Sequence, residues 1–431
     1  MACLQTQIRK LIGSIMKVLV VGNGGREHAL AWKLLQSANV ERVVCTPGNG
    51  GTATMENCLN LAISVDDFAG IVRAVGEHEI DLVVVGPEVP LAMGIVDYLQ
   101  ERDILAFGPT QAGAEIESSK SWAKEIMTQA SVPTATSATF SDPESAKTYI
   151  RSQGAPIVVK ADGLAAGKGV IVAQTLDEAI AAVEELLRDA NKLVIEEYLA
   201  GAEVSVLAVT DGKTIRPLLP AQDHKRIGEG DTGKNTGGMG AYSPVPLVTD
   251  ELMARIEGEI LQPTLNAIRQ KGIDYRGVLY AGLMITPAGE PKVIEFNCRF
   301  GDPETQVVLP LLETPLDEIL LACAAQKLDR LPPLRWKSDS AVCVVAASGG
   351  YPDAYEKGKA IAGLAAAAQK AVVFHAGTKL QSELVTDGGR VLGVTALGAD
   401  FLEAVAKAYE AIDSIQFSRM YYRRDIGHKY R

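Results

Sequence analysis

The sequence lacks several features that mark other classes of protein. Its six cysteines form no C-x-x-C pair and its five histidines show no metal-ligand spacing, which argues against a zinc site or a disulfide framework. Positive charge is in deficit, because 42 lysines and arginines stand against 53 acidic residues, a formal net charge of −11. A chain without a global positive field is not expected to bind nucleic acid. No apolar run approaches the ~20 residues of a membrane span, and the N-terminus lacks the pattern of a signal peptide, so we expect a cytoplasmic protein that does not bind membranes.

The first fifteen residues precede Met16, from which a strong strand pattern begins. They lack the apolar core and cleavage site of a signal peptide, so we interpret residues 1–15 as an upstream start or a frayed extension. What the sequence has in excess is glycine. Its 41 glycines in 431 residues exceed the ~7% of average proteins, and they fall in clusters. Clustered glycine is typical of backbone that approaches a ligand closely.

Strand and helix patterns predict a multidomain chain of mixed α/β and α+β class. They alternate over residues 16–118, which is typical of a doubly wound parallel sheet. Within residues 119–335 strand patterns follow one another as hairpins, which predicts an antiparallel core. The proline-rich segment LPPLRW then marks a boundary, and residues 336–431 resume short strands with one helix. We therefore expect a small mixed C-terminal domain.

The first glycine cluster, Gly22, Gly24 and Gly25, follows the strand pattern KVLVV and opens a helix. Glu27 stands where a dinucleotide fingerprint needs its third glycine, and the next strand has no acid for a ribose hydroxyl. NAD binding is therefore disfavoured. A glycine loop at a helix N-terminus presents free N–H groups that suit a phosphate. A tight turn without a ligand is the alternative.

The second cluster, ADGLAAGKGV, joins two strand patterns and contains Lys168, with Lys160 at the end of the preceding strand. It is not a Walker loop, because Gly169 stands where Ser or Thr would follow the lysine. A glycine loop on a hairpin can fold over a polyphosphate as a mobile lid. A plain flexible hairpin is the alternative.

The third cluster, DTGKNTGGMGAYSP, has too little apolar content to pack, so we expect a long polar loop with a functional role. Asp223, Lys225 and Arg226 precede it, and they either bind an anionic substrate or face solvent.

A fourth feature, IEFNCRFGDPET, predicts a metal site. Glu295 and Asn297 are two residues apart along a strand, so their oxygens project from one face and can share a divalent cation. Arg299 follows on that face, where a guanidinium can hold a carboxylate or phosphate bidentately. A solvated strand face is the alternative.

In their order and spacing, these motifs resemble the glycinamide ribonucleotide synthetase family of the ATP-grasp superfamily. The strings that carry the resemblance are GNGGREHALAWKL, VVGPEVPL, FGPTQAGAEIESSK, VVKADGLAAGKGVIVA, VIEEYLAG, QDHKR, NTGGMGAYSP, YAGLM, VIEFNCRFGDPETQ, FHAGT and GGRVLGVTALG. The resemblance implies an N-terminal doubly wound domain, a mobile lid at about residues 134–200, a central ATP-binding core and a C-terminal domain.

The resemblance also implies a reaction. ATP, glycine and 5-phosphoribosylamine would give glycinamide ribonucleotide, ADP and phosphate through a glycyl phosphate, the second step of de novo purine synthesis. Mg²⁺ or Mn²⁺ would be the metal, and the partners would be these small molecules only, with the protein a monomer. Two other interpretations stay open: a carboxylase or formyl-type ligase of the same superfamily, and a nucleotide-binding regulatory protein without catalysis.

Site residues follow from the resemblance motif by motif. Those implied to bind ATP are Lys120, Lys160, Gly163, Gly167, Lys168, Gly169, Glu196, Glu197, Tyr198, Leu199 and Glu203. Those implied to line the substrate pocket are Gly22, Asn23, Gly24, Gly25, Arg26, Asp223, Lys225, Arg226, Gly237, Gly238 and Arg299. Glu295 and Asn297 would hold the metal. The implied catalytic residues are Arg299, Lys160 and Asp302, with Glu304 on the substrate side.

Two features depart from the family pattern. The strand GVLYAGLMI carries no acid where ATP-grasp enzymes often place another metal carboxylate, so the coordination of a second metal is open. The connection from Asp189 to Lys192 is also short for the family. Either the lid is trimmed, or residues are absent from the sequence.

Overall fold

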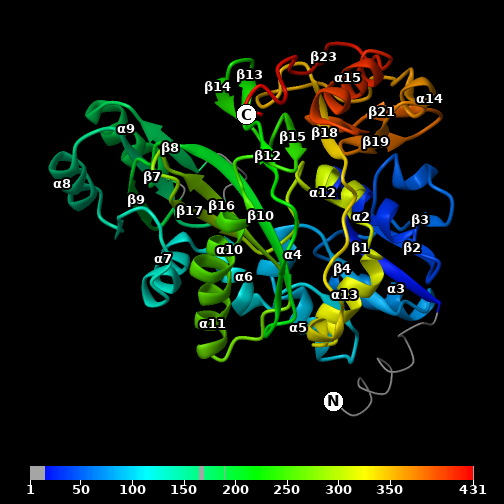
Figure 1. Cartoon of the computed structure of the whole chain (residues 1–431), viewed down its shortest axis with the longest axis horizontal. Helices are drawn as coiled ribbons and strands as arrows, with labels where there is room; N and C mark the ends of the chain where they lie inside the picture. The colour runs from blue at the N-terminus through cyan, green and yellow to red at the C-terminus, as the bar shows by residue number, and fades with distance from the viewer. Residues whose placement is uncertain (1–14, 165–168, 189, 431) are drawn as a thin grey trace.

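The computed structural model describes residues 15–164, 169–188 and 190–430. Its N-terminal part is a five-stranded parallel sheet in the order β3-β2-β1-β4-β5 (Figure 1). The strands are β1 (Met16–Gly22), β2 (Val40–Pro47), β3 (Cys58–Asn60), β4 (Leu82–Val85) and β5 (Ala106–Phe107). The helices between and after them are α2 (Gly25–Leu34), α3 (Phe68–Glu77), α4 (Glu88–Ala92), α5 (Ile95–Gln100) and α6 (Gln111–Ser118). The predicted doubly wound parallel sheet is confirmed.

A second sheet, which we call the lid sheet, stands out from the rest of the molecule at the left of Figure 1. Its order is β6-β9-β7-β8. The strands are β6 (Ser137–Phe140), β7 (Ile157–Ala161), β8 (Val170–Ala173) and β9 (Leu193–Glu197), and the helices are α8 (Pro143–Gln153) and α9 (Leu176–Leu186). The amphipathic helices bury Ile150 and Val183 against the strands, and this apolar cluster draws only on described residues between 140 and 195.

The central sheet has the order β11-β10-β16-β17 and is antiparallel throughout. Its strands are β10 (Ala202–Thr210), β11 (Ile215–Pro217), β16 (Gly277–Ile285) and β17 (Pro291–Asn297). Helix α7 (Lys120–Gln129) packs against it, and α10 (Asp250–Ile256) leads through a π-helical turn at Glu257–Leu261 into α11 (Gln262–Gln270). The predicted antiparallel core is confirmed, and its two hairpins are β10 with β11 and β16 with β17.

The C-terminal sheet runs β12-β15-β18-β22-β19, with β23 paired to β18. Its strands are β12 (Gln222–Asp223), β15 (Gly240–Ser243), β18 (Ser340–Ser348), β19 (Val372–His375), β22 (Arg390–Gly398) and β23 (Met420–Tyr421). Helices α14 (Leu364–Ala367) and α15 (Phe401–Ile412) belong to the same part, and β20 (Thr378–Leu380) pairs with β21 (Leu384–Thr386). Two strands of this sheet come from residues 222–243, so the sheet crosses the boundary expected near residue 335.

The long polar loop predicted at DTGKNTGGMGAYSP is wrong in its second half. Residues 240–243 form β15, which is buried and pairs with β18, so that Ala241 lies opposite Cys343. Small residues and the ring of Tyr242 fit between neighbouring strands, and the partner that buries them is 100 residues away in sequence. Only the first half is polar and exposed, as β14 (Thr232–Asn235), which pairs with β13 (Arg226–Gly228).

Two large apolar clusters join the N-terminal, central and C-terminal sheets. One contains Val18 of β1, Val278 of β16 and Cys343 of β18, together with α12 (Thr305–Leu311) and α13 (Leu316–Ala324). The other contains Leu19, Val204 and Val344. No described residue between 134 and 203 belongs to either cluster. In the described ranges no helix has both the length and the apolarity to cross a membrane.

Candidate active site

A buried network of two lysines and one glutamate lies where the lid sheet meets α7. Lys160, at the end of β7, places its Nζ atom 3.0 Å from Oε2 of Glu196 and 2.9 Å from the carbonyl oxygen of Ile294. The Nζ atom of Lys124 lies 3.3 Å from Oε1 of the same glutamate. Burial lowers the pKa of Lys124, against the opposing attraction of Glu196. One carboxylate shared by two lysines leaves a surplus of positive charge that suits a polyphosphate.

The start of α7 contacts the loop between β7 and β8. Lys120 donates from Nζ to the carbonyl oxygen of Gly163 at 2.8 Å. The Asp162 carboxylate accepts the Ser121 N–H at 3.2 Å and its hydroxyl at 2.5 Å, which satisfies a free donor at the helix N-terminus. Burial lowers the pKa of Lys120, although nearby Glu295 opposes this. The predicted phosphate lysine therefore contacts the first residue of the predicted lid loop.

The rest of that loop is partly described. The carbonyl oxygen of Gly169 accepts the Ala161 N–H at 2.8 Å and closes the hairpin. Gly167 and Lys168, both predicted to bind ATP, lie outside the described residues.

The strand pairing of β9 ends at Glu197, whose N–H donates to the carbonyl oxygen of Thr136 at 2.9 Å. Tyr198 and Leu199 lie beyond that pairing, and the Tyr198 side chain is 44% exposed. The segment leads directly into β10, so Tyr198 and Leu199 lie in the connection between the lid sheet and the central sheet.

Lys225 bridges two predicted site acids on the central sheet. Its Nζ atom lies 3.1 Å from Oε2 of Glu203 and 3.8 Å from Oε1 of Glu295. The attraction of Lys225 holds the pKa of Glu203 below its usual value. Burial raises the pKa of neighbouring Asp223 to about 7. The same segment does not bring Arg226 to this cluster, because its guanidinium donates to the carbonyl oxygen of Gly233 within the β13–β14 hairpin.

Glu295 and Asn297 lie on one face of β17, as predicted. Burial tends to raise the pKa of Glu295, but Lys225, Lys160 and Lys120 hold it below its usual value, so the group is a carboxylate. A carboxylate and an amide oxygen are donors that suit Mg²⁺ or Mn²⁺. Within the described ranges no three His, Cys, Asp or Glu side chains group to hold a metal.

Arg299 contacts one predicted metal ligand and two acids that the sequence did not single out. Its Nη2 atom donates to Oδ1 of Asn297 at 3.1 Å and lies 3.0 Å from Oε1 of Glu117. Its Nε atom lies 3.3 Å from Oε2 of Glu88. The arginine therefore contacts the predicted metal ligand on one side and two acids on the other.

The N-terminal glycine loop meets carboxylates. Gly22 has φ +129, and a side chain there would collide with Glu27, whose Oε2 accepts the Gly24 N–H at 2.6 Å. The Arg26 N–H donates to Oδ2 of Asp302 at 3.1 Å. The predicted substrate residues of the first and fourth motifs are thus brought together, with part of the loop's donor capacity already used. Asn23 is exposed, and Gly25 is buried at the helix start.

Arg390 of the C-terminal sheet also joins this group, although the sequence reasoning gave it no role. Its Nη1 atom donates to the carbonyl oxygens of Gly237 at 2.5 Å and Asp302 at 2.8 Å, and lies 3.3 Å from Oδ1 of Asp302. Gly238 adjoins the same guanidinium. Glu304 is buried beneath, where its Oε1 accepts the hydroxyl of Tyr280 at 2.6 Å. The string GGRVLGVTALG, which contains Arg390, is the signal that could have pointed to it.

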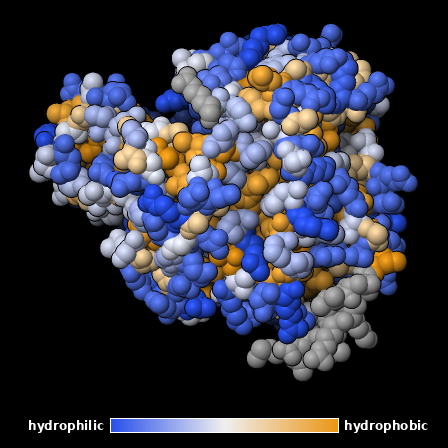
Figure 2. All heavy atoms as spheres, in the orientation of Figure 1, coloured by the Kyte–Doolittle hydropathy of each residue, from blue (hydrophilic) through white to orange (hydrophobic). Residues whose placement is uncertain are grey.

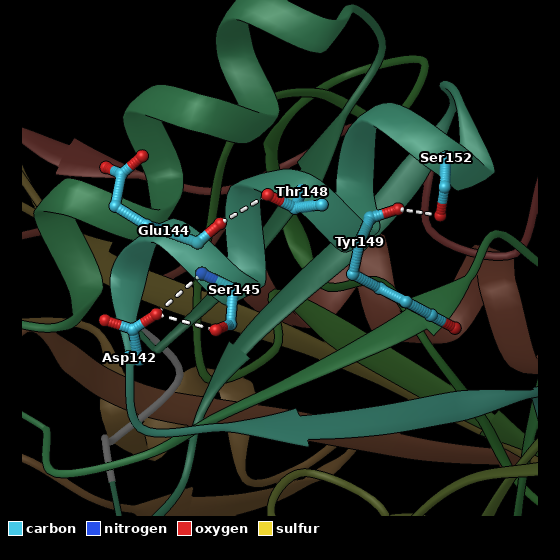
Figure 3. Close-up of a pocket in the computed structure, with 6 residues that line it drawn as sticks. All are labelled: Asp142, Glu144, Ser145, Thr148, Tyr149 and Ser152. Atoms are coloured by element: carbon cyan, nitrogen blue, oxygen red, sulfur yellow. Dashed lines mark hydrogen bonds between the residues drawn. The ribbon is translucent and has the colours of Figure 1, made fainter.

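The surface of the molecule is hollowed in two places. Figure 2 shows the lid sheet and its helices projecting at the left, with an indentation between them and the C-terminal part. A different hollow lies on the outer face of α8 and is lined by Asp142, Glu144, Ser145, Thr148, Tyr149 and Ser152 (Figure 3). The Asp142 carboxylate caps α8 by accepting the Ser145 N–H, and the Thr148 hydroxyl donates to the carbonyl oxygen of Glu144. The Asp142 and Thr148 side chains therefore already have hydrogen-bond partners. No predicted site residue lines that hollow.

Comparison with known proteins covers nearly the whole chain. It matches three domains of phosphoribosylglycinamide synthetase: the N domain over residues 16–117, the ATP-grasp (A) domain over residues 118–305 and the C domain over residues 341–429. A phosphoribosylamine–glycine ligase from a Nostoc species is 62% identical, with 96% of this chain and 99% of that one covered. One from a Synechocystis species is 60% identical, with 96% and 100% covered.

Solved structures give the same relationship. The crystal structure of phosphoribosylamine–glycine ligase from Thermotoga maritima is similar with a TM-score of 0.83 and 35% identity, covering 95% of this chain and all of that one. Biotin carboxylase from Campylobacter jejuni shares the fold alone, with a TM-score of 0.71 at 15% identity and coverage of 95% and 93%. The chain belongs to the phosphoribosylglycinamide synthetase family and is an ATP-grasp ligase.

Proposed function

We propose that this chain joins glycine to 5-phosphoribosylamine at the expense of ATP, giving glycinamide ribonucleotide, ADP and phosphate. The observation that carries the proposal is the cluster that Lys120, Lys160 and Arg299 form with the acid and the amide of β17. Family membership supports the same reaction, because the relatives named above are phosphoribosylamine–glycine ligases.

The side of this cluster nearest the lid sheet would bind ATP. Lys120 and Lys160 would neutralise the phosphates, the loop from Gly163 to Gly169 would cover them, and the backbone after Glu197 would pair with adenine. Glu203 would accept the ribose hydroxyls, for which its carboxylate has free lone pairs beside Lys225. Closure over the nucleotide excludes water from the reacting phosphate.

Glu295 and Asn297 would hold Mg²⁺ or Mn²⁺. The metal, when bound, neutralises charge on the polyphosphate. The carboxylate and the amide oxygen fix where that charge is neutralised, because Glu295 and Asn297 both pair with residues of β16. We also propose that the protein acts as a monomer in the cytoplasm, on small molecules alone.

The chemistry would proceed in two displacements. A glycine carboxylate oxygen attacks the γ-phosphorus and ADP leaves, which gives glycyl phosphate. The amine of phosphoribosylamine then attacks the acyl carbon, phosphate leaves with the bridging oxygen, and the amine loses a proton. Arg299 would hold the carboxylate and the acyl phosphate, while Asp302, the loop from Gly22 to Arg26, and the Lys225 and Gly237–Gly238 region would position the sugar phosphate. Such positioning contributes on the order of 7–11 kcal/mol to rate acceleration.

A substrate-dependence assay tests the proposal. ADP release should require both glycine and freshly generated 5-phosphoribosylamine, and mass spectrometry should find glycinamide ribonucleotide. Bicarbonate in place of glycine is the control, because carboxylases of the same fold activate it. Unchanged ADP release with bicarbonate would overturn the proposal.

A further inference from the structure

Glu117, the penultimate residue of α6, is the acid that contacts Arg299 most closely in this site. Its Oε1 atom lies 3.0 Å from Nη2 of Arg299, and its Oε2 atom accepts the backbone N–H of Cys298 at 2.8 Å. The Glu117 side chain is 9% exposed. One carboxylate therefore fixes both the guanidinium and the backbone that carries it.

Two further groups contact the Arg299 guanidinium and restrict its orientation. Glu88 approaches Nε at 3.3 Å, and Nη1 donates to the carbonyl oxygen of Phe300 at 3.3 Å. Burial raises the pKa of Glu117, against the attraction of Arg299. A buried ion pair contributes little net stability once desolvation is counted, so the consequence of this pair is chiefly geometric.

The position of Glu117 in the chain adds a second geometric link. Helix α6 ends at Ser118 and α7 begins at Lys120, whose Nζ atom contacts the lid loop at Gly163. Ser119 is the N-cap of α7 and accepts the Trp122 N–H at 3.2 Å, which fixes the bend between the helices. Glu117, which contacts Arg299, is therefore only three residues before Lys120, the predicted phosphate lysine.

We propose that Glu117 is a positioning residue that aims the Arg299 guanidinium at the reacting carboxylate and phosphoryl groups. The inference rests on the proposed function, because it needs Arg299 to act on those groups. Glu117 itself touches no substrate in this scheme.

The test replaces Glu117 by glutamine and by aspartate in the full chain. Glutamine has the same shape but offers one acceptor oxygen, so it can satisfy either Arg299 or the Cys298 N–H and not both. We expect E117Q to lower kcat about tenfold to hundredfold with the KM for ATP unchanged. E117D keeps the charge and should recover part of that loss. The control E115Q changes an exposed glutamate on the same helix and should match the wild type.

A double-mutant cycle separates positioning from a merely structural role. If Glu117 acts through Arg299, then E117Q added to R299K should lower kcat little further than R299K alone. Losses that multiply, or an E117Q enzyme with wild-type kcat, would overturn the inference. Wild-type protein that shows no glycine-dependent turnover would instead overturn the proposed function, so the two failures are distinguishable.

Discussion

The lid sheet and the N-terminal, central and C-terminal sheets are held together in different ways. The lid buries its own cluster, centred on α8, α9 and the faces of β7 and β9. The N-terminal, central and C-terminal sheets share two clusters that run through all of them. The lid meets the rest largely through polar contacts, such as Lys160 with the carbonyl oxygen of Ile294 and Lys120 with that of Gly163.

This difference in packing indicates that the lid sheet and the other sheets differ in mobility. A unit with its own core can shift against its neighbours without breaking apolar contacts, whereas sheets that share a core move as one body. The groups assigned to ATP lie at the polar junction, and those assigned to the sugar phosphate lie where three sheets meet. We therefore expect the nucleotide side to open and close and the substrate side to stay fixed.

Removing the lysine of the polar junction should have the largest effect. Lys160→Met deletes one of the two cations beside Glu196, and we expect kcat to fall by about 100- to 1,000-fold. Steady-state kinetics measures it. Lys147→Met is the control, because Lys147 pairs with exposed Glu144 and Glu184 on the same lid. Activity near that of the control would contradict a role for Lys160 in phosphate binding.

A cavity in the lid core should separate the two regions by stability. Ile150→Ala removes a fully buried side chain, which typically costs about 2–5 kcal/mol. Hydrogen exchange should then speed up in β7 and β9, while β1 and β4 keep their protection. Thr148→Ala, on the exposed side of the same helix, serves as the control. Equal acceleration in β1 and β4 would show that the cores are not separate.

Glu295→Gln tests the predicted metal site on the central sheet. Loss of the carboxylate should raise the Mg²⁺ or Mn²⁺ concentration for half-maximal activity about tenfold to hundredfold. Metal titrations of activity measure this, with Glu290→Gln in the exposed turn between β16 and β17 as the control. A titration midpoint equal to that of the wild type would remove Glu295 from the metal site.

The smallest effect concerns the junction of α2 with β19. Burial, with nearby His375, lowers the pKa of His28 to about 3, and its Nδ1 accepts the His375 N–H at 2.7 Å. Unfolded chains take up a proton that the folded state rejects, so stability is lost as pH falls from 6.5 toward 3. His28→Asn should flatten the pH dependence of the unfolding free energy by about 1.4 kcal/mol per pH unit. Denaturant titrations between pH 6 and 4 measure the slope of the unfolding free energy against pH. Equal slopes for the wild type and His28→Asn would contradict this prediction.

Much of the fold and part of the site follow from local pattern. The parallel sheet and both hairpins were predictable because each signal lies within one short segment. Glu295 and Asn297 were predictable as a pair because both belong to one strand. Their neighbours Glu117 and Arg390 were not, because α6 and β22 reach the site only through the packing of other sheets. The strand β15 was missed for the same reason, since β18 buries it.

Oxygen transfer from glycine tests the central claim most directly. Glycine labelled with ¹⁸O in its carboxylate should deliver one labelled oxygen to the released phosphate, because the bridging oxygen of glycyl phosphate leaves with phosphorus. The other label should remain in the amide of the product. Mass spectrometry of the phosphate measures this outcome. Unlabelled phosphate, with product formed, would contradict activation of glycine by ATP at this site.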